Sequence, residues 1–173
     1  MGYDLYGVNP VGYDKGEYPL LTMWEGKSWK ERKDEMPEKD EDEYWSQMGR
    51  RDSETGGYFR ANVWWWRRIW IFTCNICKDV MTQNDIDAGD SNSGIEISEE
   101  TCLKMLPLMK EAIKDGSAMD YQKTVTEYCA SVEKEDNGFI KSDDDFMANY
   151  PFSVKYFSEF ITFVERSGGF TIS

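Results

Sequence analysis

The chain has 173 residues, a length that favours one domain with one substantial hydrophobic core over two independent cores. Its content of 40% hydrophobic and 15% aromatic residues excludes a chain that is disordered throughout. A formal net charge of −13 argues against direct binding of nucleic acid or of an anionic membrane surface, because both depend on Lys and Arg side chains that neutralise phosphates.

Polar and apolar residues alternate over residues 3–8, which predicts a short strand. Residues 25–57 differ in composition from the rest, because they are rich in charge and lack an apolar period. Five acidic residues and one lysine form the run EKDEDE at residues 38–43. We therefore expect a single domain over residues 1–173 that carries a charged surface insertion at about 25–57. The few anchors of this insertion are expected to be Trp29, Trp45 and Met48.

Residues 58–81 form the most aromatic segment of the chain. Apolar residues recur in two stripes at helical spacing, which predicts one helix in the centre of the domain. The third, narrow face of this helix carries Arg60, Trp64 and Arg67, with Arg68 at its edge. The aromatic content also fits a strand over residues 63–72, and this alternative stays open.

Three further helices are expected to flank this segment. The first runs from Ser98 to about Lys114 and is kinked or divided at Pro107, the second begins at Ser117, and the third begins at Ser153. The last helix is expected to bury Val154, Phe157, Ile161 and Val164. The terminal residues FTIS then form a strand that can pair with residues 3–8. The predicted fold class is α+β, mainly α, with a central aromatic-rich helix and a small antiparallel sheet from the two termini.

Four cysteines in a chain with no recognisable secretion leader indicate reduced thiols and a cytoplasmic protein. Cys74 and Cys77 have the spacing of half a zinc site, but Cys102 and Cys129 lie singly and apart. Core packing of Cys74 and Cys77 is the favoured interpretation, and a four-cysteine zinc site is the alternative. We expect no metal and no cofactor.

The segment at residues 133–144 partly follows an EF-hand calcium loop, with Gly138 in place. Glu133 and Asp144 nevertheless occupy the first and last positions, where the motif requires Asp and a bidentate Glu. A calcium site is therefore disfavoured. The neighbouring run Asp143, Asp144 and Asp145 is interpreted as a solvated helix start rather than a magnesium site.

The chain contains no histidine, which excludes the ordinary forms of histidine-based nucleophilic and acid–base catalysis. An enzyme would have to use carboxylates, lysine or a metal. We therefore expect a protein that is not an enzyme.

Four blocks carry a resemblance to known proteins: GYDLYGVNP at 2–10, GGYFRANVWWWRRIW at 56–70, YPFSV at 150–154 and SGGF at 167–170. Together they resemble a set of small proteins encoded by bacteriophages and prophages. In that set the middle region is associated with additional paired cysteines, whereas only Cys74 and Cys77 form a pair here. The resemblance implies a phage accessory protein in the cytoplasm of its host and supplies no activity.

The leading functional hypothesis is a non-enzymatic inhibitor that binds a host protein, such as a nucleic-acid-binding or defence complex, by imitating the charge of a nucleic acid. Its candidate acidic surface comprises Glu38, Asp40, Glu41, Asp42, Glu43, Asp143, Asp144 and Asp145. If this mimicry fails, Trp29 and Trp45 become the better interface candidates. The alternative is a binder or sponge of a small anionic ligand, such as a nucleotide, at Arg60, Trp64, Arg67 and Arg68. A carboxylate–metal enzyme is the third hypothesis.

Overall fold

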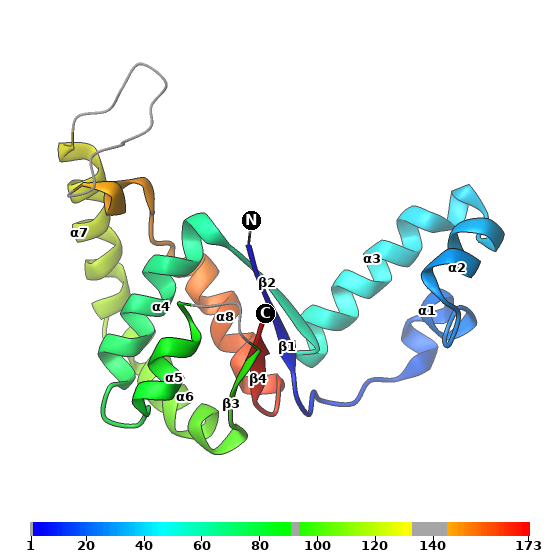
Figure 1. The fold of residues 1–173 in the computed structure, drawn as a ribbon, viewed down its shortest axis with the longest axis horizontal. Coiled ribbons are helices and arrows are strands. Elements are labelled where there is room, and N and C mark those ends of the chain that lie inside the picture. The colour runs from blue at the N-terminus through cyan, green and yellow to red at the C-terminus, as the bar shows by residue number, and fades with distance from the viewer. Residues whose placement is uncertain (1, 91–93, 133–144) are drawn as a thin grey trace.

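The computed structural model describes residues 2–90, 94–132 and 145–173 (Figure 1). Within these residues the chain forms eight α-helices and one four-stranded sheet, which confirms the predicted α+β, mainly α, fold class. In chain order the elements are β1 (Gly2–Gly7), η1 (Lys15–Glu17), α1 (Pro19–Met23), α2 (Trp29–Glu35), α3 (Glu38–Thr55), β2 (Tyr58–Asn62), α4 (Val63–Cys77), α5 (Gln83–Ala88), β3 (Ile95–Ile97), α6 (Glu99–Lys114), α7 (Ser117–Ser131), η2 (Phe146–Asn149), α8 (Val154–Arg166) and β4 (Phe170–Ile172).

The sheet has the strand order β2-β1-β4-β3, and all neighbouring strands are antiparallel. The pairing of the two termini is confirmed, because Leu5 of β1 lies opposite Ile172 of β4. Strands β2 and β3 form the two edges of the sheet and are not predicted by the sequence pattern. The hydroxyl of Tyr156 covers part of the β2 edge, because it donates a hydrogen bond to the Arg60 carbonyl and accepts one from the Asn62 amide.

The main hydrophobic core lies between the sheet and helices α4, α6 and α8. We call the sheet together with helices α4 to α8 and η2 the body. Trp66 of α4 meets Phe160 of α8 edge to face with ring centroids 5.3 Å apart, and Ile69 of α4 and Phe157 of α8 are fully buried in the same core. The indoles of Trp66 and Trp70 stack with ring centroids 5.1 Å apart. The central position predicted for the aromatic segment is therefore correct.

A single helix over residues 58–81 is wrong, because the segment divides into strand β2 and helix α4. Residues 58–62 pair with β1 along their whole length, and this pairing supplies the hydrogen bonds that a helix would otherwise provide. The side chain of Asn62 then accepts a hydrogen bond of 2.9 Å from the Trp64 amide and caps α4. The alternative strand over residues 63–72 is also wrong, since those residues are helical.

The three flanking helices predicted from the sequence are present as α6, α7 and α8. Ser98 caps α6 by accepting a hydrogen bond of 3.1 Å from the Thr101 amide. Helix α6 continues through Pro107 to Lys114, so Pro107 does not divide it. Val154 is half-buried, whereas Phe157, Ile161 and Val164 are buried as expected.

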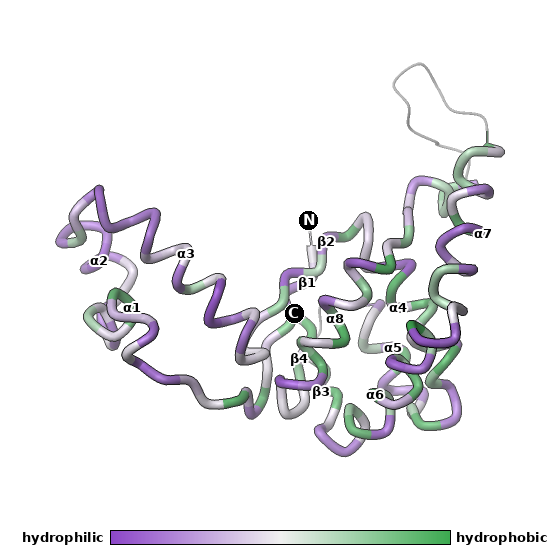
Figure 2. Tube along the Cα trace, turned by 180° about the vertical axis from the view of Figure 1, so that it is seen from behind, coloured by the Kyte–Doolittle hydropathy of each residue, from purple (hydrophilic) through white to green (hydrophobic). Residues whose placement is uncertain are grey.

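Residues 15–55 form a projection that we call the arm, consisting of η1 and helices α1 to α3 (Figure 1). The arm has a small hydrophobic cluster of its own, in which Tyr18, Leu21 and Tyr44 are buried. Trp29 and Trp45 are exposed and do not anchor it as expected, whereas Met48 packs against this cluster. Colouring by hydropathy shows that α2 and α3 are mainly hydrophilic (Figure 2).

The arm meets the body where α3 ends at Gly56, whose φ of +70° lies in the left-handed region. A Cβ atom at Gly56 would lie 2.6 Å from the backbone carbon of Arg166, so the two segments touch through their backbones. The Arg166 guanidinium donates a hydrogen bond of 2.7 Å to the Glu54 carbonyl, and the Val11 amide donates one of 3.0 Å to the Thr55 carbonyl. These contacts hold the base of the arm against α8.

Candidate functional site

The candidate site is a hollow of about 330 Å³ at the free end of the arm, which we call the arm-tip hollow. Helix α2 begins with a capping box, in which the Ser28 amide donates a hydrogen bond of 2.7 Å to the Glu31 carboxylate. Helix α3 begins at Glu38, directly after Pro37. The short connection between α2 and α3 places both helices beside the hollow. Among the side chains that line the hollow are Trp29, Arg32, Lys33, Glu38, Glu41 and Trp45.

The two tryptophans of the arm-tip hollow are unusually accessible for their size. Trp29 is 60% exposed and Trp45 is 46% exposed. Tyr44 lies below them in the arm's cluster, and its ring meets that of Trp45 edge to face at 5.3 Å. Large aromatic side chains that remain open to solvent are typical anchors of protein interfaces. The hollow therefore has the apolar element that a protein-binding surface requires.

The predicted acidic run lies on the first two turns of α3, beside the hollow. Part of its charge stabilises α3, because carboxylates near a helix N-terminus interact favourably with the helix dipole. Among the described residues, however, every ion pair of the structure uses other carboxylates. Glu38, Asp40, Glu41, Asp42 and Glu43 are therefore five successive or nearly successive carboxylates that join none of these ion pairs, although Glu43 accepts a hydrogen bond of 2.9 Å from the Gln47 side chain. A positively charged partner would relieve their mutual repulsion.

The two acidic runs predicted to act together do not form one surface in the described part of the chain. Asp143 and Asp144 lie outside the described residues, as does the EF-hand-like segment at 133–144. Asp145 precedes η2, which packs near α7 at the end of the molecule opposite the arm (Figure 1). The acidic surface of the arm must therefore be considered without Asp145.

The predicted arginine and tryptophan face is partly engaged by the protein itself. Trp64 and Arg67 both contact Tyr150, with the ring centroids of Trp64 and Tyr150 5.6 Å apart and the Arg67 guanidinium 5.4 Å from the Tyr150 ring. Arg60 lies on β2 opposite Asp4, on a different element from Arg67 and Arg68. The four residues predicted as one anion site therefore belong to two separate environments.

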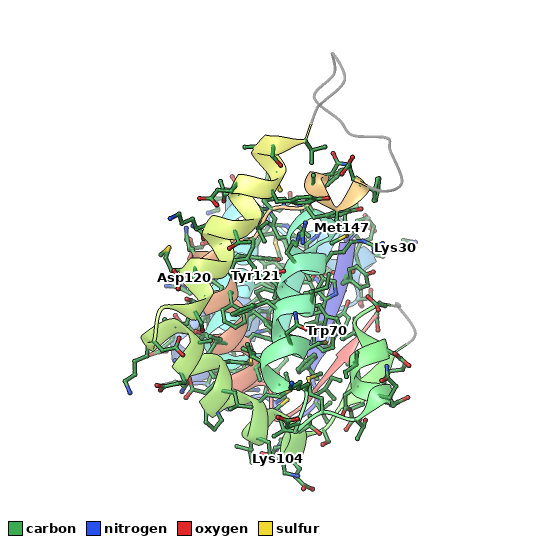
Figure 3. All side chains as sticks on the ribbon, turned by 90° about the vertical axis from the view of Figure 1, so that its left-hand side faces the viewer. Lys30, Trp70, Lys104, Asp120, Tyr121 and Met147 are labelled. Carbon is green, nitrogen blue, oxygen red and sulfur yellow. The ribbon has the colours of Figure 1, made fainter. Side chains whose placement is uncertain are left out.

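Arg68 connects three elements of the body. Its guanidinium donates hydrogen bonds of 3.0 Å to the Tyr150 carbonyl and 2.7 Å to the Met147 carbonyl, and it lies 5.5 Å from the ring centroid of Tyr128 on α7. Met147 lies beside the upper part of α4 in the side-chain view (Figure 3). These contacts hold η2 and α7 against α4, so a ligand would have to compete with two carbonyl groups for Arg68.

All four cysteines are free thiols that pack in or against the main core, in agreement with the core interpretation. Burial raises the pKa of Cys74, Cys77 and Cys102 to about 12. The residues described by the structure contain no group of three or more side chains of His, Cys, Asp or Glu that could hold a metal ion. Because of their raised pKa, the thiols of Cys74, Cys77 and Cys102 are poor nucleophiles at neutral pH.

A second hollow, of about 540 Å³, lies at the base of the arm and was not predicted from the sequence. Its lining includes Tyr6, Tyr13, Tyr58 and the carboxylate of Asp52, which pairs with Arg51 at 2.5 Å. The Tyr58 hydroxyl donates a hydrogen bond to Asp4, and burial together with this contact raises the pKa of Tyr58 to about 12. Tyr58 lies more than 40 residues from Tyr6 and Tyr13 in the sequence, and the fold brings it beside them.

No helix in the described part of the chain is long and apolar enough to span a bilayer. No family model, curated protein or solved structure matches the chain. The geometry of the arm tip and the distribution of charge therefore provide the functional argument.

Proposed function

We propose that the protein is a phage-encoded, non-enzymatic accessory protein that inhibits a host protein by binding a basic surface on it. The observation that carries the proposal is the arm tip, where two exposed tryptophans adjoin five carboxylates that join no ion pair among the described residues. The arm projects from the body, so a partner can approach its tip without a clash with the main core (Figure 1).

The two components of this surface have different physical roles. Exposed carboxylates act over a distance of about one Debye length, roughly 8 Å at physiological salt, and mainly accelerate encounter with a positively charged protein. The tryptophans act at contact, where burial of a large ring supplies most of the affinity and slows dissociation. A basic surface that normally binds nucleic acid fits both roles, so we propose a nucleic-acid-binding or defence protein as the partner.

The proposed anion sponge at Arg60, Trp64, Arg67 and Arg68 has weaker support. Arg68 is committed to two backbone carbonyls, and Arg60 lies on another element. Arg67 and Trp64 are exposed and remain the part of this face that an anion could reach.

The test is affinity capture from host cells with three matched proteins. The first variant replaces the five carboxylates of Glu38, Asp40, Glu41, Asp42 and Glu43 by the corresponding amides. The control makes the same charge change on exposed body residues that also join no ion pair among the described residues, namely Asp79, Glu96, Glu99, Asp120 and Glu159. A partner that is lost with the first variant, retained with the control, and displaced by salt or DNA supports the proposal. Equal capture by both variants would contradict it.

A further inference from the structure

We infer that the arm-tip hollow recognises an arginine side chain of the partner, and that Lys33 occupies the face of Trp29 until that arginine displaces it. This inference rests on the proposed function and names the chemical group that the site selects. Three features of the hollow carry it: the aromatic faces, the two carboxylates, and the weak attachment of Lys33.

The rings of the hollow already attract cations within the free protein. The Lys33 ammonium lies 5.0 Å from the ring centroid of Trp29, and the Arg32 guanidinium lies 5.7 Å from that of Tyr44. Cations at these distances interact favourably with the negative face of an aromatic ring, most strongly with that of tryptophan. The aromatic faces of the hollow are thus suited to a cationic side chain, provided that one of the two resident cations can leave its ring.

Two carboxylates define which cation fits best. Glu38 and Glu41 both line the hollow, and neither takes part in an ion pair among the described residues. A guanidinium can stack on an indole with its plane while its N–H groups form paired hydrogen bonds with a carboxylate. An ammonium is a compact point charge that cannot make both contacts in this way. The combination of ring and carboxylate therefore selects arginine over lysine.

The two cations of the hollow differ in how firmly the protein holds them. Arg32 is half-buried and also donates a hydrogen bond to the Lys27 carbonyl. Lys33 is exposed, and its ammonium joins no ion pair within the described residues. Lys33 can therefore leave the face of Trp29 while Arg32 stays in place.

The experiment uses the full chain and three short peptides that differ at one position, which is arginine, lysine or citrulline, within glycine and serine. Binding is followed by NMR through the indole N–H signals of Trp29 and Trp45. Trp64, which is 42% exposed on the body, serves as the internal control. We expect the arginine peptide to shift the signals of Trp29 and Trp45 but not that of Trp64. We expect the lysine peptide to bind several-fold more weakly, and the citrulline peptide most weakly of the three.

Substitution of Lys33 provides the sharper test. Lys33→Met removes the competing cation, so the arginine peptide should bind roughly two- to fivefold more tightly, the equivalent of one exposed cation–π contact. Lys30→Met is the matched control, because it removes the same charge from the same helix without opening the face of Trp29. Both variants raise the net negative charge equally. The difference between their affinities for the arginine peptide therefore measures the cost of displacing Lys33 from the face of Trp29.

Equal effects of Lys33→Met and Lys30→Met, or equal binding of the arginine and lysine peptides, would overturn the inference. If the host partner is then still lost when the five arm carboxylates are neutralised, the proposed function stands and only the arginine-selective hollow is wrong. If neutralising those carboxylates also leaves the captured partner unchanged, the proposed function fails as well.

Discussion

Truncation of Tyr44 should unfold the arm and leave the body folded. Tyr44 is 4% exposed and is one of three buried side chains in the arm's cluster. Replacing a large buried aromatic side chain by alanine costs about 3–5 kcal/mol. Each fully buried large side chain contributes only about 1.5–3 kcal/mol. Tyr44→Ala therefore removes a large share of what holds the arm's helices together.

Amide hydrogen exchange measures the local stability of the arm and of the body separately. In Tyr44→Ala the amides of α1 to α3 should lose protection, while those of α4 and α8 keep theirs and the body still unfolds cooperatively. Phe157→Ala is the matched control, because Phe157 is fully buried in the main core and its truncation should lower the stability of the body. If Tyr44→Ala destabilises the body as much as Phe157→Ala does, the arm and body are one cooperative unit and the reasoning is wrong.

Four further predictions concern single substitutions, three in the body and one, Gly49→Ala, in the arm. Gly89→Ala should lower the free energy of unfolding by at least about 2 kcal/mol in urea titrations, because the new Cβ would lie 2.0 Å from Nε1 of Trp70. Gly49→Ala should instead be neutral or stabilise by up to about 1 kcal/mol, since its Cβ meets open space within α3. Arg68→Lys should lower the melting temperature and increase hydrogen exchange in η2, because lysine cannot span the carbonyls of Tyr150 and Met147, and unchanged exchange would count against the bridging role. Burial raises the pKa of the thiols of Cys74, Cys77 and Cys102 from 9.0 in the unfolded chain to about 12 in the folded protein. As the pH rises, these thiols therefore ionise in the unfolded chain before they ionise in the folded protein. The stability that they contribute is complete below about pH 9 and is lost as the pH rises toward 12. Cys102→Ala should reduce this alkaline slope in urea titrations between pH 9 and 11, and an unchanged slope would show that Cys102 is not the group responsible.

The sequence predicts the helical body well, because local signals and periodicity agree there. Ser98 and Ser153 stand at the starts of α6 and α8, and both helices have an apolar face that the main core buries. The same approach fails at residues 58–62, where the apolar stripe of a helix also fits a strand. The pairing with β1 decides the outcome, and β1 lies more than 50 residues away along the chain. Asn62 could have indicated that the helix starts only at Val63, because asparagine before an apolar segment is typical of a helix cap.

The candidate site was predictable only in part. The acidic run and the exposed tryptophans are visible in the sequence, and the structure places them side by side at the arm tip. The hydrophobic cluster beneath them could not be predicted from the sequence, because its residues come from two different helices. Tyr18 stands at the N-cap position of α1 and Leu21 lies within α1, whereas Tyr44 lies in α3. The role of Arg68 was hidden for the same reason, since its two carbonyl partners lie about 80 residues further along the chain.

The distribution of stability explains why an arm of this kind suits a binding surface. Its cluster is small, yet its base is fixed by close backbone contacts between Gly56 and Arg166 and by the hydrogen bond from Arg166 to the Glu54 carbonyl. The base therefore determines the direction in which α3 projects, while the tip can adjust its side chains at little cost. The five acidic side chains at the start of α3 lie on the arm, so their mutual repulsion acts away from the main core. A partner that neutralises them stabilises the arm on binding, so its free energy of association includes the relief of that repulsion.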